Sequence, residues 1–146
     1  MNRADVTELH YITAIPNVNS ILRNGILVRG HNSTVSVLRV DVGVLDLPGV
    51  IVTDRNAASS WVSFLPAAEG LEAINRDRLF ARSWKHPEDM YDEMSHKSEK
   101  CAEVLVPDRV EARFVIGAYV ANQNALRAFR ALETALPVRI RNDMFF

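Results

Sequence analysis

The sequence has 146 residues, of which 48% are hydrophobic and 24% charged, proportions typical of one globular domain with a single core. With 17 Lys and Arg against 18 Asp and Glu, the net charge of −1 excludes binding of nucleic acid or anionic membranes through overall charge, so such a partner would need a local basic patch. The single cysteine, Cys101, excludes an internal disulfide, and no Cys/His cluster has metal-site spacing, so we expect no metal and a reducing, cytoplasmic location.

The N-terminal segment, MNRADVTELH, carries charges where a signal peptide has a continuous apolar core. The sequence has no run of about 18 uncharged apolar residues that could cross a bilayer as a helix. We therefore expect a soluble protein with no membrane partner, folded as one domain over residues 1–146.

The first predicted strand is LHYIT, residues 9–13, which is rich in β-branched and aromatic side chains. A short helix is expected next, because Pro16 suits a first helical turn and the Asn-Gly pair at 24–25 is a typical stop. Apolar residues between these two signals have helical spacing: Val18, Ile21 and Leu22.

Two apolar runs follow this helix. The valines and leucine of TVSVLRV, residues 34–40, predict a strand, which comes after a short apolar run at 26–28 and a polar turn at 29–33. A Pro-Gly turn at 48–49 precedes a second apolar run at 50–52.

The middle of the chain predicts two helices and a long connection. Thr53 and Asp54 can each cap a helix that Pro66 would end. The apolar face of this helix would consist of Ala57, Ala58, Trp61, Val62 and Leu65. A second, short helix is predicted within RDRLFARSW, residues 76–84, and we expect KHPEDMYDEMSHKSEK, residues 85–100, to be a mobile polar connection.

The segment KSEKCAEVLV, residues 97–106, changes from charged to apolar and predicts a strand in which Glu103 shares a face with Cys101. A carboxylate between a long loop and a rigid strand lies where loops deliver substrate. If partly desolvated, it suits proton abstraction or stabilisation of an oxocarbenium-like sugar centre. The alternative is a solvated strand residue, or one paired with Arg109 or Arg113.

The C-terminal part predicts a strand at 114–120, a helix at 122–136 and a half-buried strand at 138–142. The apolar stripe of the helix would consist of Ala125, Leu126, Phe129, Leu132 and Leu136. Arg127 and Arg130 lie outside this stripe, on a solvated face. The sum is an α+β domain with about six short strands, without the regular alternation of a doubly wound parallel sheet.

Several common site motifs are absent, namely GxGxxG, GxxxxGK[ST], GxSxG and HExxH. Their absence removes the usual sequence evidence for dinucleotide oxidoreductases, P-loop NTPases, serine hydrolases and zinc proteases. Cys101 could be a nucleophile with His86 or His96 as its base, but a single cysteine that looks buried is more often a small hydrophobic residue.

Four segments in the same order resemble the DarT family of nucleic-acid ADP-ribosyltransferases. LHYITAIPNVNSILRNGIL resembles the family's LYHIT strand and the xxxNLxSILxxGL segment after it, and TDRNAASSW is similar to TDxxAAxxY. KSEKCAEVLV resembles KRxxQAEFLV, in which the Glu is catalytic, and VRIRNDMFF is similar to VxVRPxWYY. The four segments span residues 9–146, and their shared order is more specific than any one of them.

The resemblance implies a split, mixed β-sheet of the ADP-ribosyltransferase type, flanked by short helices, and NAD as substrate. Glu103 would be the catalytic acid/base, stabilising the ribose as nicotinamide leaves and deprotonating a base of single-stranded DNA or RNA. NAD would lie against the first strand and helix, where Thr13 and Asn17 keep the family's residue types. The loop before Glu103 would contact the acceptor strand through His96, Lys97 and Lys100.

The chain departs from the family pattern in two places. The family reads Tyr-His where this chain reads His10-Tyr11, so Tyr11 occupies the register of the histidine that holds the NAD ribose and His10 points to the other face. A basic stretch and a YVPFYF-like strand are missing or compressed into residues 29–53. Arg29 and Arg39 are both candidates for the arginine that holds the NAD phosphates.

The resemblance leaves several hypotheses open. The leading one is the toxin of a toxin-antitoxin or phage-defence pair, with an antitoxin protein as partner. The alternatives are a catalytically degenerate member that binds NAD, nucleic acid or a protein, and an enzyme whose acceptor is a protein side chain or water. Taken alone, Tyr11 could be a core filler and Asn17 a helix-entry residue, and Trp61 and Trp84 are expected to pack rather than stack on bases.

Overall fold

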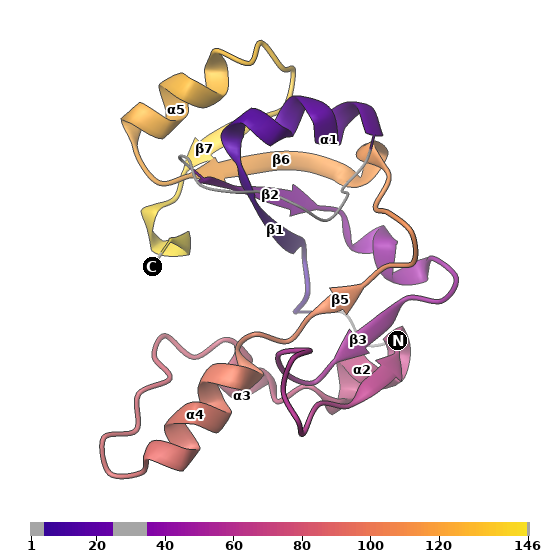
Figure 1. Cartoon of the computed structure of the whole chain (residues 1–146), viewed down its shortest axis with the longest axis vertical. Helices are drawn as coiled ribbons and strands as arrows, with labels where there is room; N and C mark the ends of the chain where they lie inside the picture. The colour runs from indigo at the N-terminus through magenta and orange to yellow at the C-terminus, as the bar shows by residue number, and fades with distance from the viewer. Residues whose placement is uncertain (1–4, 25–34, 146) are drawn as a thin grey trace. The chain divides into compact units, whose positions relative to one another are not determined.

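The computed structural model describes residues 5–24 and 35–145, which divide into two compact units (Figure 1). The terminal unit consists of the described residues of Asp5–Val44 and Asp108–Phe146, and the central unit consists of Leu45–Pro107. The predicted apolar run 26–28 and polar turn 29–33 lie outside the described residues.

The terminal unit is built on a four-stranded sheet with the strand order β1-β2-β6-β7. The strands are β1 (Leu9–Ala14), β2 (Val35–Val40), β6 (Val115–Val120) and β7 (Val138–Ile140). β2 pairs antiparallel with both β1 and β6, whereas β7 runs parallel to β6. The sequence predicts all four strands, because β-branched and aromatic residues are concentrated in them.

Helices α1 and α5 lie on the same side of this sheet (Figure 1). The helical segments of the unit are η1 (Ile15–Asn17), α1 (Val18–Asn24), η2 (Val42–Asp46, at its boundary), η3 (Ala112–Phe114), α5 (Gln123–Arg130) and η4 (Asn142–Met144). Leu38, Ala118 and Val120 share one face of the sheet and are each 1% exposed or less, so the apolar core lies against that face.

Helix α5 is shorter than predicted. It begins after Asn122, whose Oδ1 accepts the N–H of Ala125 at 3.0 Å, and it ends at Arg130. Glu133 has a φ of 54°, in the left-handed region that a helix cannot continue through. The predicted stripe therefore continues beyond the helix, while Arg127 and Arg130 lie exposed on its outer face, as expected.

The central unit contains a three-stranded antiparallel sheet with the order β4-β3-β5, which brings the described total to seven strands in two sheets. Its elements are β3 (Ile51–Thr53), β4 (Phe64–Pro66), α2 (Ala67–Ala73), α3 (Arg76–Leu79), α4 (Met90–Glu99) and β5 (Val104–Leu105). Val50, Val52 and Leu71 are 4%, 1% and 2% exposed and form part of its core. The predicted turn at 48–49 is present, and Gly49 supplies its φ of 75°.

The prediction of a helix before Pro66 is wrong, because residues 54–63 form a series of turns. Short polar side chains accept backbone N–H groups within the segment and so compete with helical hydrogen bonds. These contacts are Asn56 Oδ1 with Ala58 at 2.8 Å, Ser59 Oγ with Trp61 at 3.3 Å, and Asp54 Oδ1 with Ser63 at 2.8 Å. Pro66 does not end a helix but precedes α2.

The predicted mobile connection at 85–100 is also wrong, because most of it forms helix α4. Asp89 caps this helix, its Oδ1 accepting the N–H groups of Tyr91 and Asp92 at 2.9 and 3.0 Å. Its apolar side chains are confined to its first half, namely Met90, Tyr91 and Met94, so no apolar stripe runs along the helix and periodicity does not reveal it. Since α4 extends to Glu99, the strand expected over 97–106 is reduced to β5.

Gly70 provides a test of how α2 packs on β3. A Cβ at Gly70 would lie 2.6 Å from Val52 Cβ and 2.8 Å from the Val52 carbonyl oxygen, which is backbone and cannot rotate away. Alanine would favour the helix by about 1 kcal/mol on propensity alone, yet we expect Gly70→Ala to lower the free energy of unfolding by about 1–3 kcal/mol through overpacking. Urea denaturation measures the change, and an increase in stability would contradict the packing.

Candidate functional site

Glu103 lies directly before β5, where buried Thr53 at the end of β3 holds its backbone. The N–H of Glu103 donates to Thr53 Oγ1 at 2.9 Å, and the N–H of Thr53 donates to the Glu103 carbonyl oxygen at 2.9 Å. The Thr53 hydroxyl in turn donates to the carbonyl oxygen of Arg55 at 2.7 Å. The position of Glu103 is therefore set by a residue fifty positions earlier in the chain.

The carboxylate of Glu103 is held from the loop 54–63. Its Oε1 accepts the backbone N–H of Ala57 at 2.9 Å. Glu103 is an exposed residue, so the expectation that it is partly desolvated is not met within the described structure. A surface carboxylate with one oxygen fixed by a backbone donor keeps its second oxygen for another partner.

The loop 54–63 is itself tied down at several points. The N–H of Asn56 donates to the carbonyl oxygen of Ser98 in α4 at 2.9 Å. The N–H of Ser63 donates to Asp54 Oδ1 at 2.8 Å, which closes the loop across its ends. The donor that holds Glu103 therefore belongs to an ordered segment attached to β3, α4 and β4.

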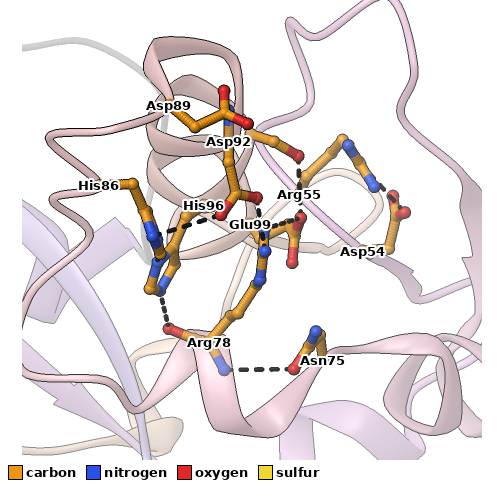
Figure 2. A network of polar contacts seen from close by, with 10 residues as sticks. Asp54, Arg55, Asn75, Arg78, His86, Asp89, Asp92, His96 and Glu99 are labelled. Carbon is orange, nitrogen blue, oxygen red and sulfur yellow. Dashed lines mark hydrogen bonds and ion pairs between the residues drawn. The ribbon is translucent and has the colours of Figure 1, made fainter.

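The three residues expected to contact an acceptor strand have different surroundings. His96 is 5% exposed, with Nε2 2.9 Å from the Arg78 carbonyl oxygen and Nδ1 2.7 Å from His86 Nε2 (Figure 2). Lys100 Nζ donates to the carbonyl oxygens of Leu79 and Ala81, at 3.0 and 2.5 Å. Lys97 is exposed. The structure therefore does not gather the three into one exposed basic patch, because His96 packs inside the central unit.

Figure 2 shows that His96 belongs to a polar network between α3 and α4. Arg78 binds Asp92 Oδ1 at 2.5 Å and Glu99 Oε1 at 3.2 Å, and His86 Nδ1 lies 3.3 Å from Asp92 Oδ2. The hydrogen bond from Arg78 lowers the pKa of Asp92, although burial acts in the opposite direction. These ion pairs, rather than an apolar stripe, join α4 to α3.

The thiol hypothesis is not supported. Cys101 is exposed, contrary to the expectation of a small buried hydrophobic residue. His86 and His96 bond to each other, and His86 also contacts Asp92. Each histidine nitrogen named here therefore already has a partner within the central unit.

A second polar cluster lies on one face of the terminal sheet, around the carboxylate of Glu8. Glu8 Oε1 lies 2.9 Å from His10 Nε2 and accepts the Tyr119 hydroxyl at 3.0 Å, while Oε2 accepts Arg39 Nε at 2.7 Å. His10, Arg39 and Gly117 face one another across β1, β2 and β6. A Cβ at Gly117 would lie 3.2 Å from Arg39 Cδ, so the glycine leaves room for the arginine.

Three further residues predicted to bind NAD, namely Tyr11, Thr13 and Asn17, lie on or near β1. Tyr11 is half-buried and pairs in register with Leu38, so it lies on the opposite face of the sheet from His10, as the alternation predicts. The backbone of Thr13 pairs with Ser36, and Asn17 is half-buried at the end of η1. Arg29 lies outside the described residues.

Sequence reasoning missed Glu8, Thr53 and the Ala57 N–H. Glu8 stands two residues before His10, and this spacing is the only signal that the two share a face. Thr53 and Ala57 lie within TDRNAASSW, but they act through a hydroxyl and a backbone donor, which periodicity does not reveal.

Two negative findings apply to the described part of the chain. No group of three or more His, Cys, Asp and Glu side chains there is arranged to hold a metal ion. None of the helices in residues 5–24 and 35–145 combines the length and the apolar character needed to cross a membrane.

Replacing Thr53 tests whether its hydroxyl positions Glu103. Thr53→Val keeps the shape but leaves the Glu103 N–H and the Arg55 carbonyl oxygen without this partner, so we expect the free energy of unfolding to fall by about 1–3 kcal/mol. Hydrogen exchange should show that the Glu103 amide loses protection in Thr53→Val and keeps it in Thr53→Ser, which retains the hydroxyl. Equal protection in both variants would contradict this role.

Glu8 predicts a pH dependence. Burial acts to raise the pKa of Glu8, but hydrogen bonds from His10, Arg39 and Tyr119 and the charge of Arg39 together hold it below its ordinary value of 4.5. The stability that Glu8 contributes is therefore fully present above about pH 4.5 and lost as the pH falls through the lower, folded-state pKa. We expect the free energy of unfolding to fall less steeply in this acidic window in Glu8→Gln than in the wild type, and equal slopes in denaturation series would contradict it.

Comparison with known proteins identifies related chains. A family model described as "ssDNA thymidine ADP-ribosyltransferase, DarT" matches residues 28–146. Among curated proteins, no match is found. The family match begins after the first resemblance segment and includes the other three, which confirms the resemblance.

Solved structures share the fold. Thermus sp. 2.9 DarT in complex with NAD+ has a TM-score of 0.75 at 17% identity, over 97% of this chain and 98% of that one. The same protein in complex with ADP-ribosylated ssDNA has a TM-score of 0.74 at 16% identity, over 96% of each chain. Thermosipho africanus DarTG in complex with ADP-ribose has a TM-score of 0.73 at 19% identity, over 95% of this chain.

This chain spans about half, 51%, of the Thermosipho chain. At these identities the structural likeness establishes the fold, which confirms the predicted α+β, ADP-ribosyltransferase-like class. The family model extends over much more than half of the sequence and over parts of both compact units. The chain therefore belongs to the DarT family of ssDNA thymidine ADP-ribosyltransferases.

Proposed function

We propose that this chain transfers ADP-ribose from NAD to a thymidine base of single-stranded DNA. Its membership of the DarT family supports the reaction and the acceptor. Relatives of the same fold bind NAD+, carba-NAD+ and ADP-ribosylated ssDNA, which agrees with NAD as substrate and single-stranded DNA as acceptor. The observation that carries the proposal is the Glu103 carboxylate, which the backbone donor of Ala57 holds in place.

In the proposed reaction, the bond between the ribose anomeric carbon and nicotinamide breaks, and nicotinamide leaves with the electron pair. The positive charge that develops on the ribose is stabilised by the carboxylate of Glu103. The acceptor base then bonds to the anomeric carbon and loses its proton to Glu103 acting as general base. The Ala57 N–H occupies Oε1 and restricts rotation of the carboxylate, leaving Oε2 for the ribose and the proton.

We propose that NAD binds along β1 and the turn into α1, through His10, Tyr11, Thr13 and Asn17. Tyr11 would supply its hydroxyl where the family has a histidine, and its position opposite Leu38 keeps it in that register. Arg39 is one candidate for the NAD phosphates, because Glu8 accepts from its Nε. The two terminal guanidinium nitrogens of Arg39 could then bind phosphate. Arg29 is the other candidate.

We further propose that the two units act as one catalytic domain, since the family match includes parts of both. We propose the cytoplasm as its location, in keeping with the single cysteine of the sequence. The biological role that we propose is the toxin of a toxin-antitoxin or phage-defence pair, with an antitoxin protein as partner. Growth of cells that express the wild type, compared with cells that express Glu103→Gln, tests this role. An active toxin arrests growth, and the variant relieves the arrest.

The central experiment incubates the protein with radiolabelled NAD and single-stranded DNA oligonucleotides that contain or lack thymidine. We expect label on the thymidine-containing strands alone, and we expect Glu103→Gln to reduce the rate about 10²–10⁴-fold, the contribution typical of a general acid or base. Glu72→Gln is the matched control, because Glu72 is an exposed carboxylate of α2 in the same unit, and its rate should equal that of the wild type.

Each arm of this experiment distinguishes an alternative. Label on RNA or on protein, and none on DNA, would reassign the acceptor. Folded wild-type protein that binds NAD or DNA without any transfer would support the catalytically degenerate member, whose motivating observation is Tyr11 in place of histidine. Equal rates in Glu103→Gln and the wild type would remove Glu103 from the chemistry.

A further inference from the structure

Trp61 is 82% exposed, so the expectation that it packs in the core is wrong. Single exposed apolar residues are common on proteins and mean little by themselves. Trp61 differs from such residues because it lies on the loop 54–63, the segment whose Ala57 N–H binds the carboxylate of Glu103. The loop that carries the exposed indole therefore also holds the proposed catalytic carboxylate.

The backbone around Trp61 is ordered. The N–H of Trp61 donates to Ser59 Oγ at 3.3 Å, and the N–H of Val62 donates to the Ser59 carbonyl oxygen at 3.4 Å. The contact between Ser63 and Asp54 then closes the loop. Because the backbone is already fixed, a ligand that contacts the indole need not order the loop, and this raises affinity.

The chain limits the distance between Trp61 and Ala57, the residue whose N–H binds Glu103. Trp61 is four positions after Ala57, so their Cα atoms are at most about 14 Å apart even if the chain were fully extended. The turns at 57–61 shorten this distance further. The chain therefore keeps the backbone of Trp61 near the residue whose N–H binds Glu103.

We propose that Trp61 is a stacking platform for an unpaired base next to the thymidine that accepts ADP-ribose, an inference that rests on the proposed function. The bases of a single strand are unstacked and expose their faces, and an indole offers a large, rigid π-surface to them. Ser59, Ser60 and Ser63 of the loop are small and polar and Val62 is half-buried, so the indole is the largest apolar surface that the loop itself exposes; Phe64, which begins β4, is 52% exposed.

Binding of single-stranded DNA, measured separately from catalysis, tests the proposal. We use the Glu103→Gln background, because the amide oxygen of glutamine can still accept from Ala57 and keep the loop in place. Anisotropy of a fluorescein-labelled thymidine-containing oligonucleotide gives the Kd. Trp61→Ala should raise Kd about 5- to 100-fold, the loss typical of one stacked base.

Conservative and matched variants separate stacking from other effects. Trp61→Phe retains a π-face and should bind several-fold more tightly than Trp61→Leu, which is apolar but cannot stack. Tyr91→Ala is the matched control, because Tyr91 in α4 is also 82% exposed and belongs to the same unit. Its Kd should stay within about twofold of the background value, as expected for a surface substitution away from the site. Thermal unfolding confirms that each variant is folded.

Several outcomes would overturn the proposal: an unchanged Kd in Trp61→Ala, equal losses in Tyr91→Ala, equal binding by the Phe and Leu variants, or no DNA binding by the folded background protein. The proposal would also be overturned if Trp61→Ala raised the Kd for NAD but not the Kd for DNA, because the indole would then bind NAD. Failure of ADP-ribose transfer by the wild type, by contrast, would count against the proposed function and leave the binding result to decide on Trp61.

Discussion

The central unit depends on a small set of hydrogen bonds that converge on Glu103. Thr53 holds the backbone of this residue at the end of β3, and Ala57 holds its side chain from the following loop. Both partners are about fifty residues away in the sequence, so the geometry of the carboxylate exists only once β3 and β5 have paired. A hydroxyl and a backbone N–H are small, rigid donors and acceptors, and they place a carboxylate without burying it.

The two units are stabilised in different ways. In the terminal unit, α1 and α5 cover a sheet whose buried face consists of apolar residues such as Leu38 and Val120 (Figure 1). In the central unit, α4 is joined to α3 by Arg78 and its two carboxylate partners, and Met90, Tyr91 and Met94 of α4 remain exposed. Partly exposed ion pairs contribute little individually, so α4 depends on its cap and on the network as a whole.

The contacts of Glu8 bear on the order His10-Tyr11 in β1, where the family pattern reads Tyr-His. His10 lies on the opposite face of β1 from Tyr11 and binds Glu8 together with Arg39 and Tyr119. The Glu8 carboxylate accepts from Arg39 and Tyr119 on this face of the sheet, whereas Tyr11 lies on the other face, in register with Leu38. The His10-Tyr11 order therefore places His10, rather than Tyr11, beside the carboxylate of Glu8.

The sequence by itself determined the four strands of the terminal sheet, the helix after β1 and the α+β class, because runs of β-branched residues and helix signals such as Pro16 and Asn24 are local features. It failed at residues 54–65 and 85–100, where polar side chains decide the backbone by binding distant or competing partners. Only the tertiary structure could show that Thr53 and Ala57 hold Glu103, that His96 is buried and that Trp61 is exposed. These properties depend on the pairing of β3 with β5 and on the contacts of the loop 54–63 with Glu103 and α4, which join residues far apart in the sequence.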